Sequence, residues 1–144
     1  MRGSVDRGPP YVGALLRLSM MVVRRRLLDA IARGGYLDVT AAHLPLFAYP
    51  FPEGMQPGDL AARASQSKQA MNHVLVEMEK RGYVARRAMR PGGRRLVYLT
   101  RKGMNVVDIC QKEMLAVQGE LAKKVGRRQF DNFLDVLRAV ATEA

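Results

Sequence analysis

Residues 60–103 read LAARASQSKQAMNHVLVEMEKRGYVARRAMRPGGRRLVYLTRKG. The polar turn at 65–67 separates a short alanine-rich run from a longer amphipathic run. Because Ser67 is a favourable N-cap and Gly82 a favourable stop, the longer run predicts a helix over 68–81. Its core-facing stripe has the i, i+3, i+4, i+7 spacing: Met71, Val74, Leu75 and Met78. The stretch therefore predicts two helices joined by a tight turn.

The last part of the same stretch predicts a β-hairpin. Residues alternate as in a strand over 94–100, a partner strand is expected at 83–89, and a Pro- and Gly-containing tip lies at 90–93. Nine basic side chains and no acid occupy the hairpin and its flanks: Lys80, Arg81, Arg86, Arg87, Arg90, Arg94, Arg95, Arg101 and Lys102. Since the formal net charge of the chain is +11, this hairpin predicts a polyanionic partner, with duplex DNA favoured.

Helical signals precede this stretch. Apolar residues recur at helical spacing from Tyr11 to about Arg33, where a Gly-Gly pair at 34–35 provides a stop. A short helix is expected over 40–48, capped by Thr40 and ended near 49–50. A proline- and glycine-rich loop at 51–58 then leads into another short helix at about 57–64.

Two further helices are expected after the hairpin. The first begins after Thr100, with an apolar stripe of Met104, Val107, Cys110, Met114, Val117 and Leu121. The pattern breaks around Gly126. The final helix has one apolar face, formed by Phe130, Phe133, Leu134, Leu137, Val140 and Ala141.

These elements predict a mainly α protein of the α+β class: a winged helix-turn-helix with a two-stranded wing, flanked by long N- and C-terminal dimerisation helices. Residues 1–10 are expected to be flexible and 11–144 to form a single domain, with the winged lobe at about 37–100 and the dimerisation helices at about 11–35 and 101–144. One small lobe cannot cover the apolar surface of these helices, which predicts a homodimer. The expected contact uses 11–33 and the helices after Gly103, above all Phe130, Phe133, Leu134 and Leu137.

Other function classes are disfavoured. The two histidines, one cysteine and scattered acids form no metal-spaced cluster, nucleophile elbow or phosphate loop, so we expect neither an enzyme nor a cofactor. Cys110 lies in the middle of an apolar stripe, where a buried structural thiol is commoner than a redox switch. Arginines at 17 and 24–26 interrupt the apolar run at 11–23, so we expect no membrane span and a cytoplasmic location.

Residues 58–103 resemble the MarR family of winged-helix transcriptional regulators. As in that family, Leu60-Ala61 opens the first helix of the helix-turn-helix and Ser67-Lys68-Gln69-Ala70 opens the second. The segment at 96–103, LVYLTRKG, closely resembles the family's closing wing strand, Leu-Val-x-Leu-Thr-x-x-Gly. The resemblance implies a homodimer that binds a pseudo-palindromic operator in double-stranded DNA, with repression the expected mode of regulation.

Two positions depart from the family pattern. The family often carries an Asp-x-Arg element at the wing tip, whereas this chain has Pro91-Gly92-Gly93 followed by Arg94 and Arg95. Ser65 stands where a glycine is common in the turn. The acid that would orient a wing arginine is missing, so we expect Arg94 or Arg95 to enter the minor groove less rigidly.

DNA contacts are expected from the polar face of the 68–81 helix and from the wing. Gln69 and Asn72 can bond adenine at two positions, and Lys68 can reach guanine or phosphate. The expected contact residues are Ser67, Lys68, Gln69, Asn72, His73, Arg86, Arg87, Arg90, Arg94 and Arg95. Such a polar helix face would by itself be interpreted as solvated, but its position beside an acid-free basic hairpin favours groove contact.

The resemblance also implies a pocket for a small aromatic or anionic effector between the dimer helices and the DNA-binding lobe. Its expected lining is Met20, Arg24, Tyr36, His43 and Phe47, residues that are equally compatible with an ordinary packed junction. The arginine run at 24–26 is interpreted as a solvated helix face.

Two other function classes stay open. One is an architectural winged helix that binds nucleic acid without sequence specificity, and the other is a winged helix that binds proteins and has lost DNA recognition. A strong preference for one palindrome over random DNA would identify a regulator. Binding to any duplex with equal affinity and a steep dependence on salt would identify the architectural class. An absence of DNA binding at low salt leaves the protein-interaction class.

Overall fold

The computed structural model describes residues 7–48, 51, 53–88 and 90–142. Its elements follow in the order α1 (Val12–Arg33), the 3₁₀ turn η1 (Ala41–His43), α2 (Pro45–Ala48), α3 (Pro57–Arg63), α4 (Lys68–Lys80), β1 (Val84–Ala88), β2 (Arg95–Leu99), α5 (Arg101–Val125) and α6 (Arg127–Thr142). The predicted winged helix-turn-helix with long flanking helices is confirmed. The expectations for 1–6, 49–50, 52, 89 and 143–144 lie outside the described residues.

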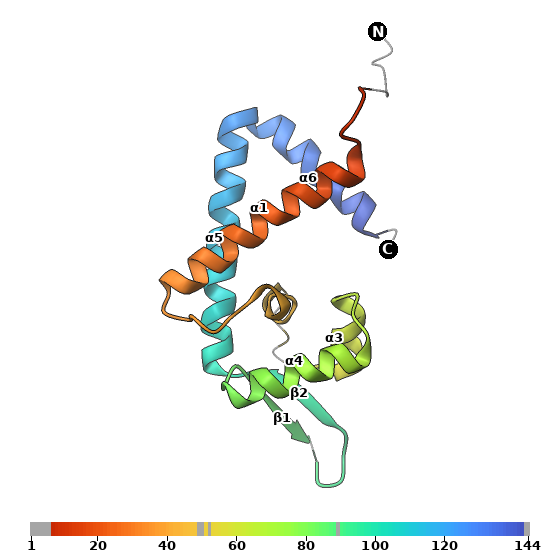
Figure 1. The fold of residues 1–144 in the computed structure, drawn as a ribbon, viewed down its shortest axis with the longest axis vertical. Coiled ribbons are helices and arrows are strands. Elements are labelled where there is room, and N and C mark those ends of the chain that lie inside the picture. The colour runs from red at the N-terminus through yellow and green to blue at the C-terminus, as the bar shows by residue number, and fades with distance from the viewer. Residues whose placement is uncertain (1–6, 49–50, 52, 89, 143–144) are drawn as a thin grey trace.

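α1 and α6 lie toward the end of the molecule opposite the helix-turn-helix, and α5 runs from one end to the other (Figure 1). α1 packs across α5, and α6 folds back from the far end of α5. α3, α4 and the β1–β2 hairpin form the other end, with the hairpin outermost. One core cluster connects the two ends, with Ile31 from α1, Val106 and Val107 from α5, and Met71 and Leu75 from α4.

The turn between α3 and α4 has the predicted geometry. The Oγ atom of Ser67 accepts a hydrogen bond of 3.0 Å from the backbone N–H of Ala70 and so caps α4. Ser65 has a φ of 51°, in the left-handed region that favours glycine, which explains why glycine suits this position. The predicted core stripe on α4 is confirmed, because Met71, Leu75 and Met78 are buried and Val74 is half-buried.

The short helix expected over 40–48 is divided into η1 and α2. Pro45 is the first residue of α2. Proline has no N–H group to donate inside a helix, so η1 ends before it and a new helix begins at it. Leu46 and Phe47 then point into the core, where they are almost completely buried.

Sequence reasoning assigned no role to the loop at 51–56, and the structure supplies one. Phe51 is buried, and Met55 pairs with Val97 through backbone hydrogen bonds of 2.9 and 2.8 Å. Since β1 pairs with the other edge of β2, Val97 is held from both sides. The loop therefore holds the middle of β2 from the side opposite β1.

The flanking helices expose much of their apolar surface. On α1, Ile31 is buried, whereas Val12 is 72% exposed. On α6, Phe130 is buried, whereas Phe133 is 48% exposed and Val136 63%. Across the described part of the chain, α1 included, no helix is both long and apolar enough to span a membrane.

α5 buries only its first half. Val106, which is absent from the predicted stripe, is buried beside Val107 and Cys110. Leu121, which the stripe includes, is 39% exposed. The second half of α5 extends beyond the lobe, where the described part of the chain covers it less completely (Figure 1).

Candidate nucleic-acid interface

The recognition face of α4, defined here as Lys68, Gln69, Asn72 and His73, is exposed. These residues lie on successive turns of one side of the helix, opposite the buried Met71. The Ser67 cap orders the first turn of the helix. The structure thus brings the predicted α4 contact residues together on one surface.

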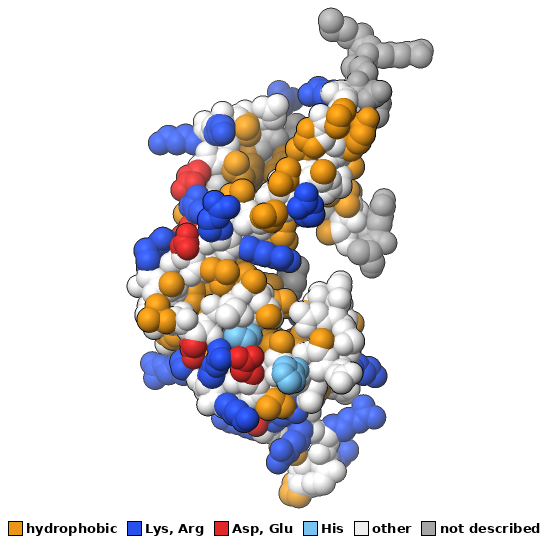
Figure 2. Space-filling view, viewed as in Figure 1, with side chains coloured by type: hydrophobic (Ala, Val, Ile, Leu, Met, Phe, Trp, Pro, Cys, Tyr) orange, Lys and Arg blue, Asp and Glu red, His pale blue; other side chains and the backbone are white. Residues whose placement is uncertain are grey.

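The wing is the expected antiparallel hairpin. The backbone N–H of Gly93 donates to the carbonyl oxygen of Arg90 at 2.9 Å and closes the tip. Arg87, Arg94 and Arg95 are exposed along it, as is Arg90 itself. Figure 2 shows basic side chains gathered around this end of the molecule.

One wing arginine has a partner from the loop before α3. Nη1 of Arg94 donates to Oε1 of Gln56 at 3.4 Å. A neutral amide oxygen therefore lies beside Arg94, and it does not offset the charge of the arginine. Sequence reasoning missed Gln56 because the two residues are 38 positions apart and no motif links them.

Three of the nine cations hold the fold together. Lys102 donates to the backbone oxygen of Arg81 at 2.8 Å, and Nη2 of Arg81 lies 2.6 Å from Oε1 of Glu77. Nε of Arg86 lies 3.3 Å from Oε2 of Glu79. The sequence from 80 to 102 contains no acid, but the fold brings two carboxylates of α4, those of Glu77 and Glu79, next to its arginines. Within the described part of the chain, Arg86 is the predicted contact residue whose charge an acid offsets in this way.

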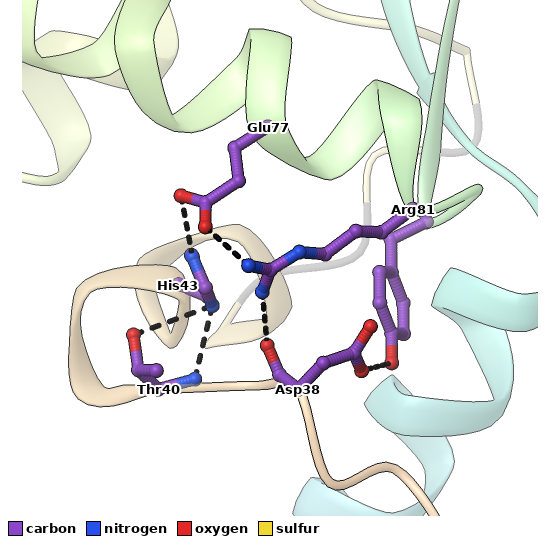
Figure 3. Close-up of polar contacts among 6 residues, drawn as sticks. Asp38, Thr40, His43, Glu77 and Arg81 are labelled. Atoms are coloured by element: carbon purple, nitrogen blue, oxygen red, sulfur yellow. Dashed lines mark hydrogen bonds and ion pairs between the residues drawn. The ribbon is translucent and has the colours of Figure 1, made fainter.

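A polar network joins α4 to the segment that follows α1 (Figure 3). Nδ1 of His43 accepts from the backbone N–H of Thr40 at 2.9 Å, and Nε2 lies 3.2 Å from Oε2 of Glu77. Because an accepting Nδ1 carries no proton, Nε2–H is the donor to Glu77. Arg81 bonds both Glu77 and the backbone oxygen of Asp38.

Two carboxyl groups in this region have lowered pKa values. The hydrogen bond from His43 holds the pKa of Glu77 below its ordinary value. The hydroxyl of Tyr83 donates to Asp38 and lowers the pKa of that carboxyl, while burial raises the pKa of Tyr83. Both carboxyl groups are therefore held in their charged form.

A cavity of about 470 Å³ lies between α1, the η1–α2 segment, α3 and α5. Met20, Arg24 and Phe47, three of the five residues expected to contact an effector, line it together with Arg63 and Cys110.

Burial raises the pKa of the Cys110 thiol to about 11. The expectation of a buried thiol is confirmed.

The other two expected effector residues lie outside the cavity lining. The ring of Tyr36 packs against that of Tyr83, with centroids 6.2 Å apart. His43 is 2% exposed and belongs to the network behind α4. Both are therefore part of the packed junction.

Arg26 corrects the expectation of a solvated arginine run at 24–26. Its Nε lies 2.8 Å from Glu113, and its two Nη atoms lie 2.7 and 3.0 Å from the oxygens of Glu120. Arg26 therefore bridges α1 and α5. Its hydrogen bonds to Glu120 lower the pKa of that carboxyl, so that both the guanidinium and the carboxylate are held in their charged forms.

No family model matches this sequence, and no curated protein does. Solved structures do. The MarR-family protein Rv2887 of Mycobacterium tuberculosis, in complex with salicylic acid, is 27% identical and has a TM-score of 0.65, covering 94% of this chain and 98% of that chain. The same protein in complex with DNA is 25% identical with a TM-score of 0.63, covering 90% and 97%. The transcriptional repressor CouR, bound to a 23-mer DNA duplex, is 22% identical with a TM-score of 0.69, covering 91% and 92%.

Proposed function

We propose that this chain, which has the fold of the MarR family of winged-helix transcriptional regulators, is a dimeric, sequence-specific DNA-binding regulator that acts as a repressor. The observation that carries the proposal is the exposed recognition face of α4 beside exposed wing arginines. These two features lie on neighbouring elements at the end of the molecule distant from α6 (Figure 1). DNA complexes of structures with this fold support the proposal.

The two features divide the work of recognition. α4 is a helix whose exposed polar side chains can reach base edges in the major groove. The wing arginines contact phosphates or the adjacent minor groove, which contributes affinity with little sequence information. In a two-fold dimer the pair of recognition helices reads the two halves of a pseudo-palindromic operator.

Variants of each feature test the division. Replacing both Arg94 and Arg95 with Ala should weaken binding to every duplex and lower the slope of log affinity against log salt by about 2, since each lost phosphate contact removes about 0.9. Gln69→Ala should instead relax preference at particular base pairs, each worth roughly 1–3 kcal/mol. Fluorescence anisotropy over a salt series measures both effects.

Arg127 and Arg128 provide the matched control, because they also form an adjacent pair but lie at the start of α6. Their double replacement with Ala removes the same charge and should leave the salt slope unchanged. An equal loss in the control would show that net charge alone drives binding, which would support the architectural class.

The cavity extends the proposal to a small aromatic or anionic effector. Met20 and Phe47 contribute an apolar and an aromatic residue to the lining, which also includes Arg24 and Arg63. Rv2887 is solved with salicylic acid, an aromatic anion. An occupant between α1 and the η1–α2 segment would change the position of the lobe relative to the long helices and so the spacing of the two recognition helices.

Titration with salicylate in the presence and absence of duplex DNA tests this extension. Coupling is reciprocal, so an effector must bind the free protein and the DNA complex with different affinities. Arg24→Met should weaken the binding of salicylate more than that of an uncharged analogue such as phenol. Equal affinity for salicylate in both titrations would rule it out as an effector.

A further inference from the structure

Arg86 extends from β1 across the recognition face of α4. Its Nη2 donates to Oδ1 of Asn72 at 3.3 Å, and its Nε lies 3.3 Å from Oε2 of Glu79. Asn72 and Glu79 are seven residues apart, about two helical turns, so they lie on the same side of α4. The side chain of Arg86 is only 21% exposed, whereas Asn72 is exposed. A side chain of wing strand β1, Arg86, thus contacts a side chain of the recognition helix α4, Asn72.

The contact fixes which end of the Asn72 amide faces outward. A guanidinium group has only donors, so it is the oxygen of Asn72 that faces Arg86. The amide nitrogen is then turned away from Arg86, with both its N–H groups available. Bidentate pairing with adenine needs the amide oxygen and nitrogen together. A cation beside that oxygen opposes the approach of a donor such as the adenine amino group.

We propose that Arg86 is a positioning residue that presents Asn72 to the major groove as a hydrogen-bond donor, so that Asn72 selects guanine, whose major-groove edge carries two acceptors, over adenine. The inference rests on the proposed function and goes beyond it by setting a base preference. Glu79 completes the arrangement as an ion pair: its carboxylate lies 3.3 Å from Nε of Arg86 without forming a hydrogen bond to it, and it offsets the charge that Arg86 would bring to a phosphate.

The test compares base preferences selected from a pool of random-sequence duplexes by the full-length wild type and by variants. Asn72→Ala identifies the base pair that Asn72 reads. Arg86→Met keeps the length of the stem and removes the guanidinium, whereas Arg86→Lys keeps the charge but cannot hold Asn72 and Glu79 together. Both variants should lower the preference for guanine over adenine at that base pair by roughly tenfold.

Arg87→Met is the matched control, since it removes the same charge from the next residue of β1, an exposed one. It should weaken binding to all duplexes and leave the base preference unchanged. Combining Asn72→Ala with Arg86→Met should give the base preference of Asn72→Ala alone, because Arg86 acts through Asn72. A melting curve confirms that each variant is folded, and Arg86→Lys serves if Arg86→Met is not.

Two results would overturn the inference, and they are distinguishable. If the Arg86 variants keep the wild-type preference and lose affinity for all duplexes as Arg87→Met does, Arg86 is a backbone contact. If the wild type enriches no sequence above the starting pool, the proposed function fails and the inference fails with it.

Discussion

Gly103 shows how much one residue of the wing motif contributes to the fold. The backbone N–H of Gly103 donates to Oγ1 of Thr100 at 3.2 Å, and the same hydroxyl donates to the backbone oxygen of Gly82 at 2.5 Å. A Cβ atom built on Gly103 would overlap the backbone oxygen of Tyr83. The final glycine of the motif at 96–103 is therefore required where α5 begins against the backbone of Tyr83, between α4 and β1.

Gly103→Ala should lower the free energy of unfolding by roughly 1–3 kcal/mol, the usual cost of overpacking. Gly119 in the same helix is the control, because a Cβ atom there would meet nothing within 4 Å. Gly119→Ala should raise stability by about 0.5–1 kcal/mol through higher helix propensity. Urea denaturation measures both, and equal effects would contradict the packing described for Gly103.

Cys110 should be an unreactive thiol. With its pKa raised to about 11, it should react with a thiol reagent at pH 8 roughly a hundredfold more slowly than an ordinary cysteine, since only the thiolate attacks. Peroxide should leave DNA binding unchanged in the wild type and in Cys110→Ala. Rapid modification, or loss of binding on oxidation in the wild type alone, would identify Cys110 as a redox switch instead.

At the scale of elements, the network behind α4 links the recognition helix to the η1–α2 segment. That segment contacts α4 through His43 and lines the cavity through Ala41, Leu44 and Phe47. A shift of η1 and α2 would therefore act on the recognition helix directly. Glu77 is the residue of α4 that receives this contact.

Glu77→Gln should lower the melting temperature at pH 7, because it removes a carboxylate that pairs with Arg81 and accepts from His43. The folded-state pKa of Glu77 is lowered, so its contribution is present above its ordinary value of 4.5 and is lost as pH falls through the folded-state value. The difference between variant and wild type should shrink accordingly below about pH 4.5. A difference that does not depend on pH would contradict this account.

The elements were predictable from local signals, and the tertiary contacts were not. The Ser67 cap, the Gly82 stop and strand β2 were predicted from short-range patterns, and the structure confirms them. The contact of Arg94 with Gln56 and that of Arg26 with Glu120 join distant segments, so no periodicity reports them. Exposed residues of α4 were predictable because they follow the helix period, whereas the residues that contact them from other elements depend on the tertiary fold.

At the scale of the whole molecule, the exposed apolar faces of α1 and α6 predict a homodimer. Phe130 was expected in the contact but is buried within its own chain, whereas Phe133 is 48% exposed. Sedimentation of the wild type at micromolar concentration should show little monomer, and Phe133→Glu should shift the protein toward monomer by burying an unpaired charge. Leu37→Glu, at a site 82% exposed in the segment after α1, is the control and should sediment as the wild type does. A monomeric wild type would remove the basis for two-fold recognition.

A competition titration tests whether the protein binds DNA with sequence specificity as a two-fold dimer. The duplex enriched from a random pool competes, at one fixed salt concentration, against the same duplex with the left, the right or both halves scrambled. The enriched duplex should be a pseudo-palindrome with half-site centres about 34–36 Å apart, and the protein should bind it at least about a thousandfold more tightly than the fully scrambled duplex. Scrambling either half should cost about the same affinity. Equal affinity for all four duplexes would contradict sequence-specific binding.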